Sequence, residues 1–171
     1  FEELLYENTL HNALFNSLVV SITSTILATI LGTLVARAST RYIFYGKKIS
    51  ITFILVPLIL PEIILGVCLL TVLIQLGLEL NLWSVVLGHT LLITPFSTLI
   101  MVSAFNNLDI SLEEASLDLG MSSLQTFRII ILPMVSPGLI SSLLIGFVIS
   151  LDEFIIAFFL TGVEPTLPVY I

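Results

Sequence analysis

Residues 113–133 read EEASLDLGMSSLQTFRIIILP and separate two hydrophobic runs of the chain. The stretch combines carboxylates, serines, a glycine and an arginine, and it closes on a proline. Two helices can be joined by a far shorter connection, since most helix–helix connections take about 2–8 residues. A polar connection of this length therefore indicates an ordered element with a function of its own.

Helix signals in and before this stretch predict two short helices. Asp109 or Ser111 is a candidate N-cap, and Ser111 with Glu114 has the spacing of a capping box. Gly120 stands where it can end the first helix in a left-handed conformation. Ser122, followed three residues later by a glutamine, repeats the capping spacing. We therefore expect a helix, a glycine hinge and a second helix along the membrane surface.

A helical wheel predicts how the first helix is oriented. One face would carry Leu112, Ala115, Ser116 and Leu119, and the other would carry Glu113, Glu114, Leu117 and Asp118. An amphipathic helix that only lies on lipid is the alternative. The carboxylates argue against it, because the cytoplasmic leaflet is itself negative. A partner protein is the better interpretation of this helix.

The composition indicates which solvent surrounds the chain. Of its 171 residues, 57% are hydrophobic and 10% are charged, and the mean hydropathy is +1.18. Soluble domains carry about 25% charged residues. The long uncharged runs predict an all-α integral membrane protein, because barrel strands would alternate in polarity. The chain begins with Phe1 and not with Met, so we treat it as a fragment.

The uncharged runs are long enough for four transmembrane helices, each of which needs about 20 apolar residues. We place them near 13–36, 51–76, 83–105 and 134–160, in a single transmembrane domain of residues 1–171. Prolines 57, 61 and 95 are expected to kink or locally unwind their helices.

The five basic residues orient these spans. Four lie between the first two spans and one lies before the last: Arg37, Arg41, Lys47, Lys48 and Arg128. Cytoplasmic loops carry an excess of Lys and Arg. Loops 37–50 and 106–133 are therefore expected to be cytoplasmic.

Three acids, Glu62, Asp152 and Glu153, lie within the predicted spans. An isolated charge at such depth costs at least ~2.5–3.5 kcal/mol, so these groups should face a cavity or a partner. They could hydrogen-bond to neighbouring helices, or they could line the path of a cation, since no Lys or Arg lies within the spans. His89 in the third span is expected to be a satisfied hydrogen-bonding residue and not a metal ligand.

The residues from 114 onward are similar to the EAA loop of ABC importer permeases. The shared pattern is Glu114-Ala115-Ser116, three residues, Gly120, nine residues, Ile130, one residue and Leu132-Pro133. Ser116 is the one departure, because the family usually has a second alanine there. The segments LPEIILG at 60–66, SLDEFIIAFFLTG at 150–162 and TLPVYI at 166–171 resemble the spermidine/putrescine-type permeases in particular.

This resemblance implies a type I ABC importer permease with six transmembrane helices, one of them before Phe1 and one after Ile171. The loop would be a coupling helix that docks on a separate ATP-binding subunit. The docking residues would be Glu113, Glu114, Ala115, Ser116, Leu117 and Gly120. The implied function is the import of polyamines, with Glu62, Asp152 and Glu153 along the substrate path.

The resemblance also implies partners and a location. The partners would be ATP-binding subunits, a second permease subunit and an extracytoplasmic solute-binding protein, in the plasma (inner) membrane of a bacterium. No nucleic acid is expected as a partner. ATP and Mg²⁺ would belong to the ATPase, because this chain has no G-x-x-x-x-G-K-[ST] phosphate loop. We expect no catalytic, cofactor or metal site in this chain.

Two alternatives stay open at this point. The chain could be an ABC permease for another solute, such as ferric iron, sulfate or thiamine. It could also be a self-contained secondary transporter or channel, although such a protein has no need of a docking helix.

Overall fold

The computed structural model describes residues 8–171, and its regular elements over that range are helices. The first seven residues of the predicted domain lie outside this description. The longer helices are α2 (Asn8–Arg41), α3 (Lys47–Leu55), α4 (Glu62–Gln75), α5 (Leu82–Asn106), α6 (Ile110–Asp118) and α9 (Ser136–Asp152). The shorter ones are η1 (Val56–Leu58), α7 (Ser123–Thr126), the π-helical turn η2 (Phe127–Ile131), α8 (Leu132–Met134), α10 (Ile155–Leu160) and α11 (Leu167–Tyr170). The all-α prediction is confirmed.

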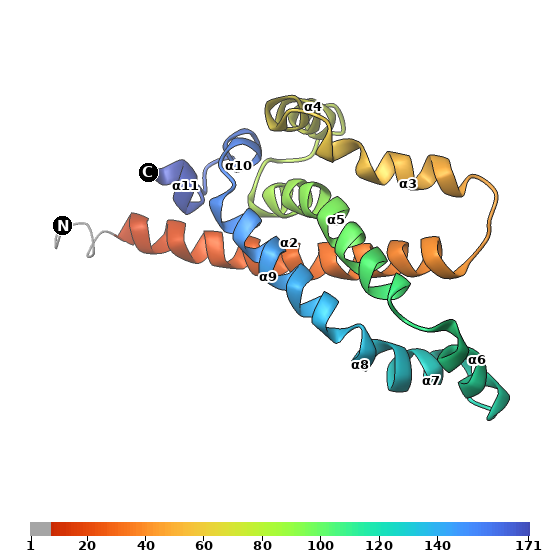
Figure 1. Ribbon diagram of the computed structural model, residues 1–171. Coiled ribbons are helices and arrows are strands. Elements are labelled where there is room, and N and C mark those ends of the chain that lie inside the picture. The colour runs from red at the N-terminus through yellow and green to blue at the C-terminus, as the bar shows by residue number, and fades with distance from the viewer. Residues whose placement is uncertain (1–7) are drawn as a thin grey trace.

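Helix α2 runs along the molecule, and α5 and α9 pack against it (Figure 1). Small residues allow this close approach. A Cβ atom on Gly32 of α2 would lie 2.6 Å from the Ser97 Cβ on α5, and one on Gly146 of α9 would lie 2.9 Å from Ile93. Packing of this kind is how helices associate in a membrane, where no hydrophobic force drives them together. The three helices form the frame that carries the other elements.

Within residues 8–171, two helices are long and apolar enough to cross a membrane, and up to four spans result if each of two bent pairs counts as one. The predicted spans 13–36 and 83–105 lie inside the two long helices, α2 and α5. Pro95 lies inside α5, which runs unbroken past it, so it does not unwind its helix.

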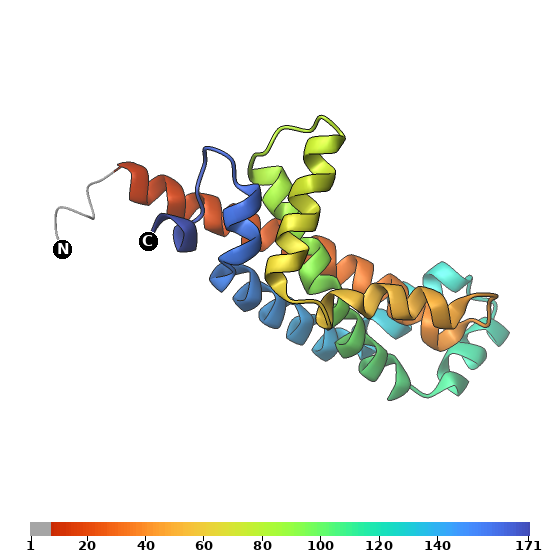
Figure 2. The same ribbon diagram turned by 90° about the horizontal axis from the view of Figure 1, so that it is seen from above.

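The predicted span 51–76 is not one straight helix. The segments Lys47–Leu58 and Glu62–Gln75 meet at 108°, and the turn is visible from above (Figure 2). Pro61 causes the break, because a proline has no N–H to donate and disfavours helical geometry in the residue before it. Its own backbone is non-helical, with φ −57° and ψ 135°. The proline prediction holds here.

The predicted span 134–160 is also interrupted. Helix α9 ends at Asp152, and α10 begins only at Ile155. The prediction of a continuous helix over this range was therefore wrong. No proline or glycine marks the interruption in the sequence. The cause is a side chain, Glu153, whose contacts are described below.

The short helices α6, α7 and α8 lie together at the end of the molecule opposite α11 (Figure 1). They form the connection between α5 and α9 over residues 107–135. The predicted arrangement of a helix, a glycine hinge and a second helix is confirmed, although the second helix is divided by the π-helical turn η2.

Candidate functional site

Helix α6 begins and ends at the residues that its local signals predict. Asp109 is the N-cap, and its carboxylate accepts the Ser111 backbone N–H at 3.0 Å. That bond, and then the Ser111 hydroxyl, hold the pKa of the Asp109 carboxyl below its usual value because both favour the charged form. Of the two candidate N-caps, Asp109 is the one used.

Gly120 ends α6 with a φ of +86°. Its N–H donates to the Leu117 carbonyl at 2.9 Å, and the Met121 N–H donates to the Ser116 carbonyl at 3.2 Å. This pair of bonds is the Schellman arrangement, which requires a residue in the left-handed region. The predicted hinge at Gly120 is confirmed, as is the second capping box, which Ser122 and Gln125 form.

The predicted faces of α6 were wrong. Glu113 and Ser116, one turn apart, point into the protein. Ser116 is 2% exposed, and its hydroxyl lies 2.6 Å from the Thr126 hydroxyl on α7. Leu119, expected on the face of Ser116, is 84% exposed. The inward side of α6 thus takes one residue from each predicted face, because Glu113 reaches Arg37 and Arg41.

Glu113 joins α6 to the end of α2. Its carboxylate lies 3.0 Å from Arg37 Nη2 and 3.4 Å from Arg41 Nε. Arg37 also lies over the Phe127 ring, 4.5 Å from its centroid, and Arg41 donates to the Phe105 carbonyl at 3.2 Å. These side chains are largely buried. Arg37 and Arg41, two of the five basic residues used to predict the orientation, therefore also hold α6 against α2.

Four of the six predicted docking residues are exposed: Glu114, Ala115, Leu117 and Gly120. They stand on the outer side of α6 and its C-terminal turn. Glu113 and Ser116, by contrast, are used to hold the segment in place. The outer side of α6 is therefore one exposed part of this connection that another protein could reach.

A second site lies where α9 is interrupted. A cavity of about 510 Å³ is lined by Glu62, Asp152 and Glu153, together with Val148, Ile149, Phe154 and Ile155. Glu62 is the first residue of α4, and Asp152 is the last residue of α9. The structure thus brings together all three acids that the sequence placed within the spans. No Lys or Arg belongs to the described lining.

The three carboxylates differ in their surroundings. Glu62 and Asp152 are exposed, and among residues 8–171 they have no hydrogen-bond or ion-pair partner. Glu153 is buried and accepts the backbone N–H groups of Ile156 at 2.8 Å and Ala157 at 3.0 Å. It therefore caps the start of α10, which explains why the helix is interrupted there.

His89 is the partner of Glu153 that sequence reasoning missed. Its Nε2 lies 3.1 Å from Glu153 Oε2, an ion-pair distance without the alignment of a hydrogen bond. Its Nδ1 lies 2.7 Å from the Ser150 hydroxyl. The expectation of a hydrogen-bonded histidine holds for Nδ1, whereas Nε2 is buried without a hydrogen-bond partner among the described residues. No signal in the sequence connects His89 to position 153, because the pairing depends on how α5 and α9 pack.

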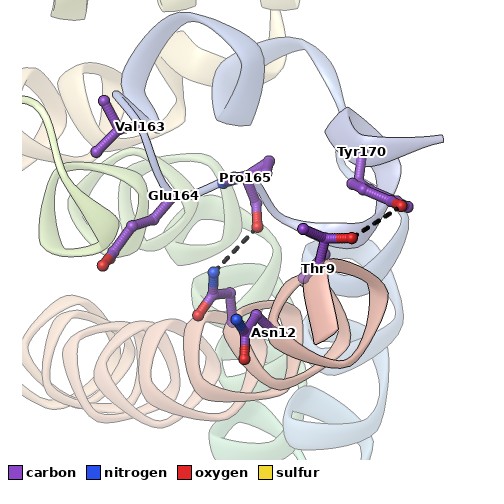
Figure 3. Close-up of a pocket in the computed structure, with 8 residues that line it drawn as sticks. Thr9, Asn12, Val163, Glu164, Pro165 and Tyr170 are labelled. Atoms are coloured by element: carbon purple, nitrogen blue, oxygen red, sulfur yellow. Dashed lines mark hydrogen bonds between the residues drawn. The ribbon is translucent and has the colours of Figure 1, made fainter. Parts of the chain in front are cut away.

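A further pocket, of about 480 Å³, lies between the start of α2 and the C-terminal segment (Figure 3). Asn16 Nδ2 donates to the Pro165 carbonyl at 3.1 Å, and the hydroxyls of Thr9 and Tyr170 are 3.3 Å apart. These contacts, with the Leu167 N–H donating to Ser17 Oγ at 2.7 Å, fasten residues 161–171 to α2. The sequence contained no sign of this pocket.

Among residues 8–171, no three His, Cys, Asp or Glu side chains are grouped so that they could hold a metal ion. A helical membrane domain with a capped, outward-facing helix at one end and an acidic cavity at the break of a span is an arrangement suited to a transport protein. The chain belongs to the family of binding-protein-dependent transport system inner membrane components, whose pattern matches residues 28–169.

The chain is similar to several curated permeases. It is 35% identical to the spermidine/putrescine transport system permease protein PotC of Haemophilus influenzae over 129 residues, which cover 75% of this chain and 50% of that protein. It is 34% identical to the putrescine transport system permease protein PotI of Escherichia coli over 70% of this chain and 44% of that protein. The chain spans about half the length of the curated relatives that it matches.

Solved structures share the fold. An inward-facing structure of the MetNI methionine ABC transporter matches with a TM-score of 0.70 and 21% identity, over 89% of this chain and 73% of that one. A crystal structure of an amino acid ABC transporter with histidines matches with a TM-score of 0.67 and 18% identity, over 89% and 72%. These matches confirm the fold of an ABC importer permease.

Proposed function

We propose that this chain is the membrane-spanning permease subunit of an ATP-driven importer and that the imported solute is a polyamine such as spermidine or putrescine. The observation that carries the proposal is the acidic cavity lined by Glu62, Asp152 and Glu153. Its support is the similarity to permeases of spermidine and putrescine.

The charge of the cavity favours a cationic solute. Two of its carboxylates are exposed and have no partner among the described residues. Keeping such groups within a span is costly, which is why they are normally found along substrate or ion pathways. An ammonium group that donates to a carboxylate contributes about 1.5–3 kcal/mol, because bonds to charged groups are the strong ones. A polyamine offers several such groups along one flexible chain.

The outer side of α6 supports coupling to an ATPase. Glu114, Ala115, Leu117 and Gly120 are exposed on a helix that is capped at both ends. A rigid helix seated in a groove of another subunit can transmit the motion of that subunit. ATP and Mg²⁺ belong to the ATP-binding subunits in this proposal. A second permease subunit and an extracytoplasmic solute-binding protein complete the importer.

The same proposal sets the topology. Loops 37–50 and 106–133 lie on the cytoplasmic side of a bacterial plasma membrane, where the ATP-binding subunits are. The pocket of Figure 3 then lies on the outer side, at the other end of α2. An importer of sulfate fits the acidic cavity poorly, because an anion would be repelled there.

Uptake measurements on the reconstituted importer test this function. Proteoliposomes would be supplied with labelled spermidine, putrescine, ferric iron, sulfate or thiamine, and ATP hydrolysis would be followed with each solute. We expect both polyamines to stimulate ATP hydrolysis and to be taken up. Stimulation by another solute alone would overturn the polyamine assignment, and uptake without ATP would favour a secondary transporter.

Asp152→Asn tests the role of the acidic cavity directly, because it keeps the shape and removes the charge. We expect spermidine uptake below saturation to fall at least about tenfold, since ~1.4 kcal/mol corresponds to that factor. Glu79→Gln is the matched control, because Glu79 is an exposed acid that does not line the cavity. Uptake by Asp152→Asn equal to that of Glu79→Gln would show that the charge of Asp152 has no role.

A further inference from the structure

His89 stands in a chain of polar contacts that crosses three helices. It is 1% exposed on α5, and its Nδ1 lies 2.7 Å from Ser150 Oγ on α9. Ser150 in turn lies 3.0 Å from Ser24 Oγ on α2. On the other side of the ring, Nε2 faces Glu153 at 3.1 Å. The imidazole therefore connects the frame of the fold to the interruption between α9 and α10.

Glu153 uses both carboxylate oxygens at this interruption. Oε1 accepts from the Ile156 N–H and Oε2 accepts from the Ala157 N–H. An unpaired backbone N–H in an apolar environment is unfavourable, because no water is available to satisfy it. Glu153 thus stabilises the start of α10, and its oxygens are less available to a solute than those of Glu62 and Asp152.

The position of Asp152 depends on the same interruption. Asp152 is the last residue of α9, and the backbone turns out of the helix at Glu153, where ψ is 119°. If α9 continued helically, the residues after 152 would follow a different course around the cavity. The capping of α10 by Glu153 therefore sets the geometry of the lining, and His89 is the side chain that faces this cap.

We propose that His89 is a positioning residue for the acidic cavity. By its contacts with Ser150 and Glu153 it keeps the Glu153 carboxylate at the start of α10, and this holds Asp152 exposed to the cavity. The solute's ammonium groups are then received by Asp152 and Glu62, whereas Glu153 maintains the site. This division of roles rests on the proposed function, but the placement of Asp152 can be tested without it.

The first test measures the exposure of position 152 in the assembled importer. Cys68 is exposed and is replaced by serine in every variant, so that it does not react. Asp152→Cys is then labelled with a cationic methanethiosulfonate, with and without His89→Leu. Val148→Cys is the matched control, because Val148 lines the same cavity one turn earlier on α9. We expect His89→Leu to slow labelling at 152 at least about threefold and to leave labelling at 148 unchanged, since only the residues at the interruption depend on the cap.

The second test measures spermidine uptake with Asp152 in place. We expect His89→Leu to raise the KM for spermidine with a smaller change in kcat. The variant alters the geometry of the cavity, whereas α6 and its C-terminal turn are intact. His89→Gln should recover part of the loss, since its amide can donate to Glu153.

The outcomes separate the two proposals. Unchanged labelling at position 152 in His89→Leu would overturn the positioning role, whatever the transport result. Slower labelling together with normal spermidine uptake by Asp152→Asn and Glu62→Gln would support the positioning role and overturn the cation path. Equal slowing at positions 148 and 152 would show a general change of packing and would also overturn the positioning role.

Discussion

Glu113 and Glu153 are two largely buried carboxylates, and each needs partners that balance its charge. The two differ in the partners that they have. Glu113 lies on α6 and pairs with Arg37 and Arg41, whose guanidinium groups carry a positive charge. Glu153 lies within a predicted span and is paired with His89 and two backbone N–H groups. The carboxylate of Glu113 is balanced by two arginines, and that of Glu153 mostly by backbone N–H groups and an imidazole ring.

The difference has a physical reason. An arginine within a span would have to be desolvated together with its partner, and the cost of burying two full charges can exceed their attraction. At Glu153 the backbone N–H groups of Ile156 and Ala157 bond to the carboxylate, and among the described residues no arginine or lysine pairs with it. The Glu113 side chain is 18% exposed, and the two arginines connect α2 to α5, α6 and η2. The two sites should therefore respond differently to the same substitution.

The largest effect is expected from Glu113→Gln. The amide cannot balance Arg37 and Arg41, whose side chains are largely buried, and breaking a buried pair on one side costs about 3–5 kcal/mol. Since these side chains keep some contact with water, we expect the lower end of that range. The melting temperature of the purified importer should fall clearly. Glu114→Gln, an exposed neighbour, is the control and should melt like the parent.

The matched variant Glu153→Gln is expected to have a smaller effect, about 1–2 kcal/mol. Its amide oxygen can still accept one backbone N–H, and His89 can be neutral beside it. The same melting measurement compares it with Glu113→Gln. A larger loss of stability at position 153 than at position 113 would show that the contrast between the two sites is wrong.

Gly120→Val tests how far the connection between α5 and α9, residues 107–135, depends on backbone geometry in addition to charge. Valine at a φ of +86° is strained, at a cost of about 1–2 kcal/mol. The strain would alter the turn that directs the chain from α6 to α7. We expect ATP-driven uptake to fall while the protein still inserts into the membrane, as seen by membrane fractionation. Gly46→Val is the control, since Gly46 is also left-handed but lies in another loop. Uptake by Gly120→Val equal to that of Gly46→Val would contradict a special role for this turn.

The smallest effect is expected at Asp109, which caps α6 at the surface. Because its folded pKa is lowered by the hydrogen bonds from Ser111, its stabilising effect is present above the unfolded pKa and is lost as pH falls through the folded value. The protection of the Ser111 amide against hydrogen exchange, relative to its intrinsic rate at each pH, should be higher at neutral pH than in acid. In Asp109→Asn the acid-dependent change should disappear. A pH dependence that persists in that variant would assign it to another group.

The local features of residues 107–135 could be predicted because each depends on a few neighbouring residues. Asp109 caps the amide two positions later, Ser122 and Gln125 cap each other, and Gly120 is the residue that tolerates a left-handed turn. The all-helical membrane class likewise followed from long uncharged runs, since a lipid solvent demands internal backbone bonding. The proline break at residue 61 belongs to the same group.

Other features were decided only by the tertiary structure, because they depend on residues that are far apart in the sequence. Glu113 points inward because Arg37, which is 76 residues earlier in the chain, lies beside it in the last turns of α2. A helical wheel of α6 does not include that arginine. The interruption after Asp152 carries no proline or glycine, and it exists because Glu153 meets both the start of α10 and a histidine on α5. The sequence by itself determined the helical membrane class, the two long helices α2 and α5 and the caps of α6 and α7, through composition and local bonding. The packing of α2, α5 and α9 decided which charges meet, because pairing energy depends on distance in space and not on separation in sequence.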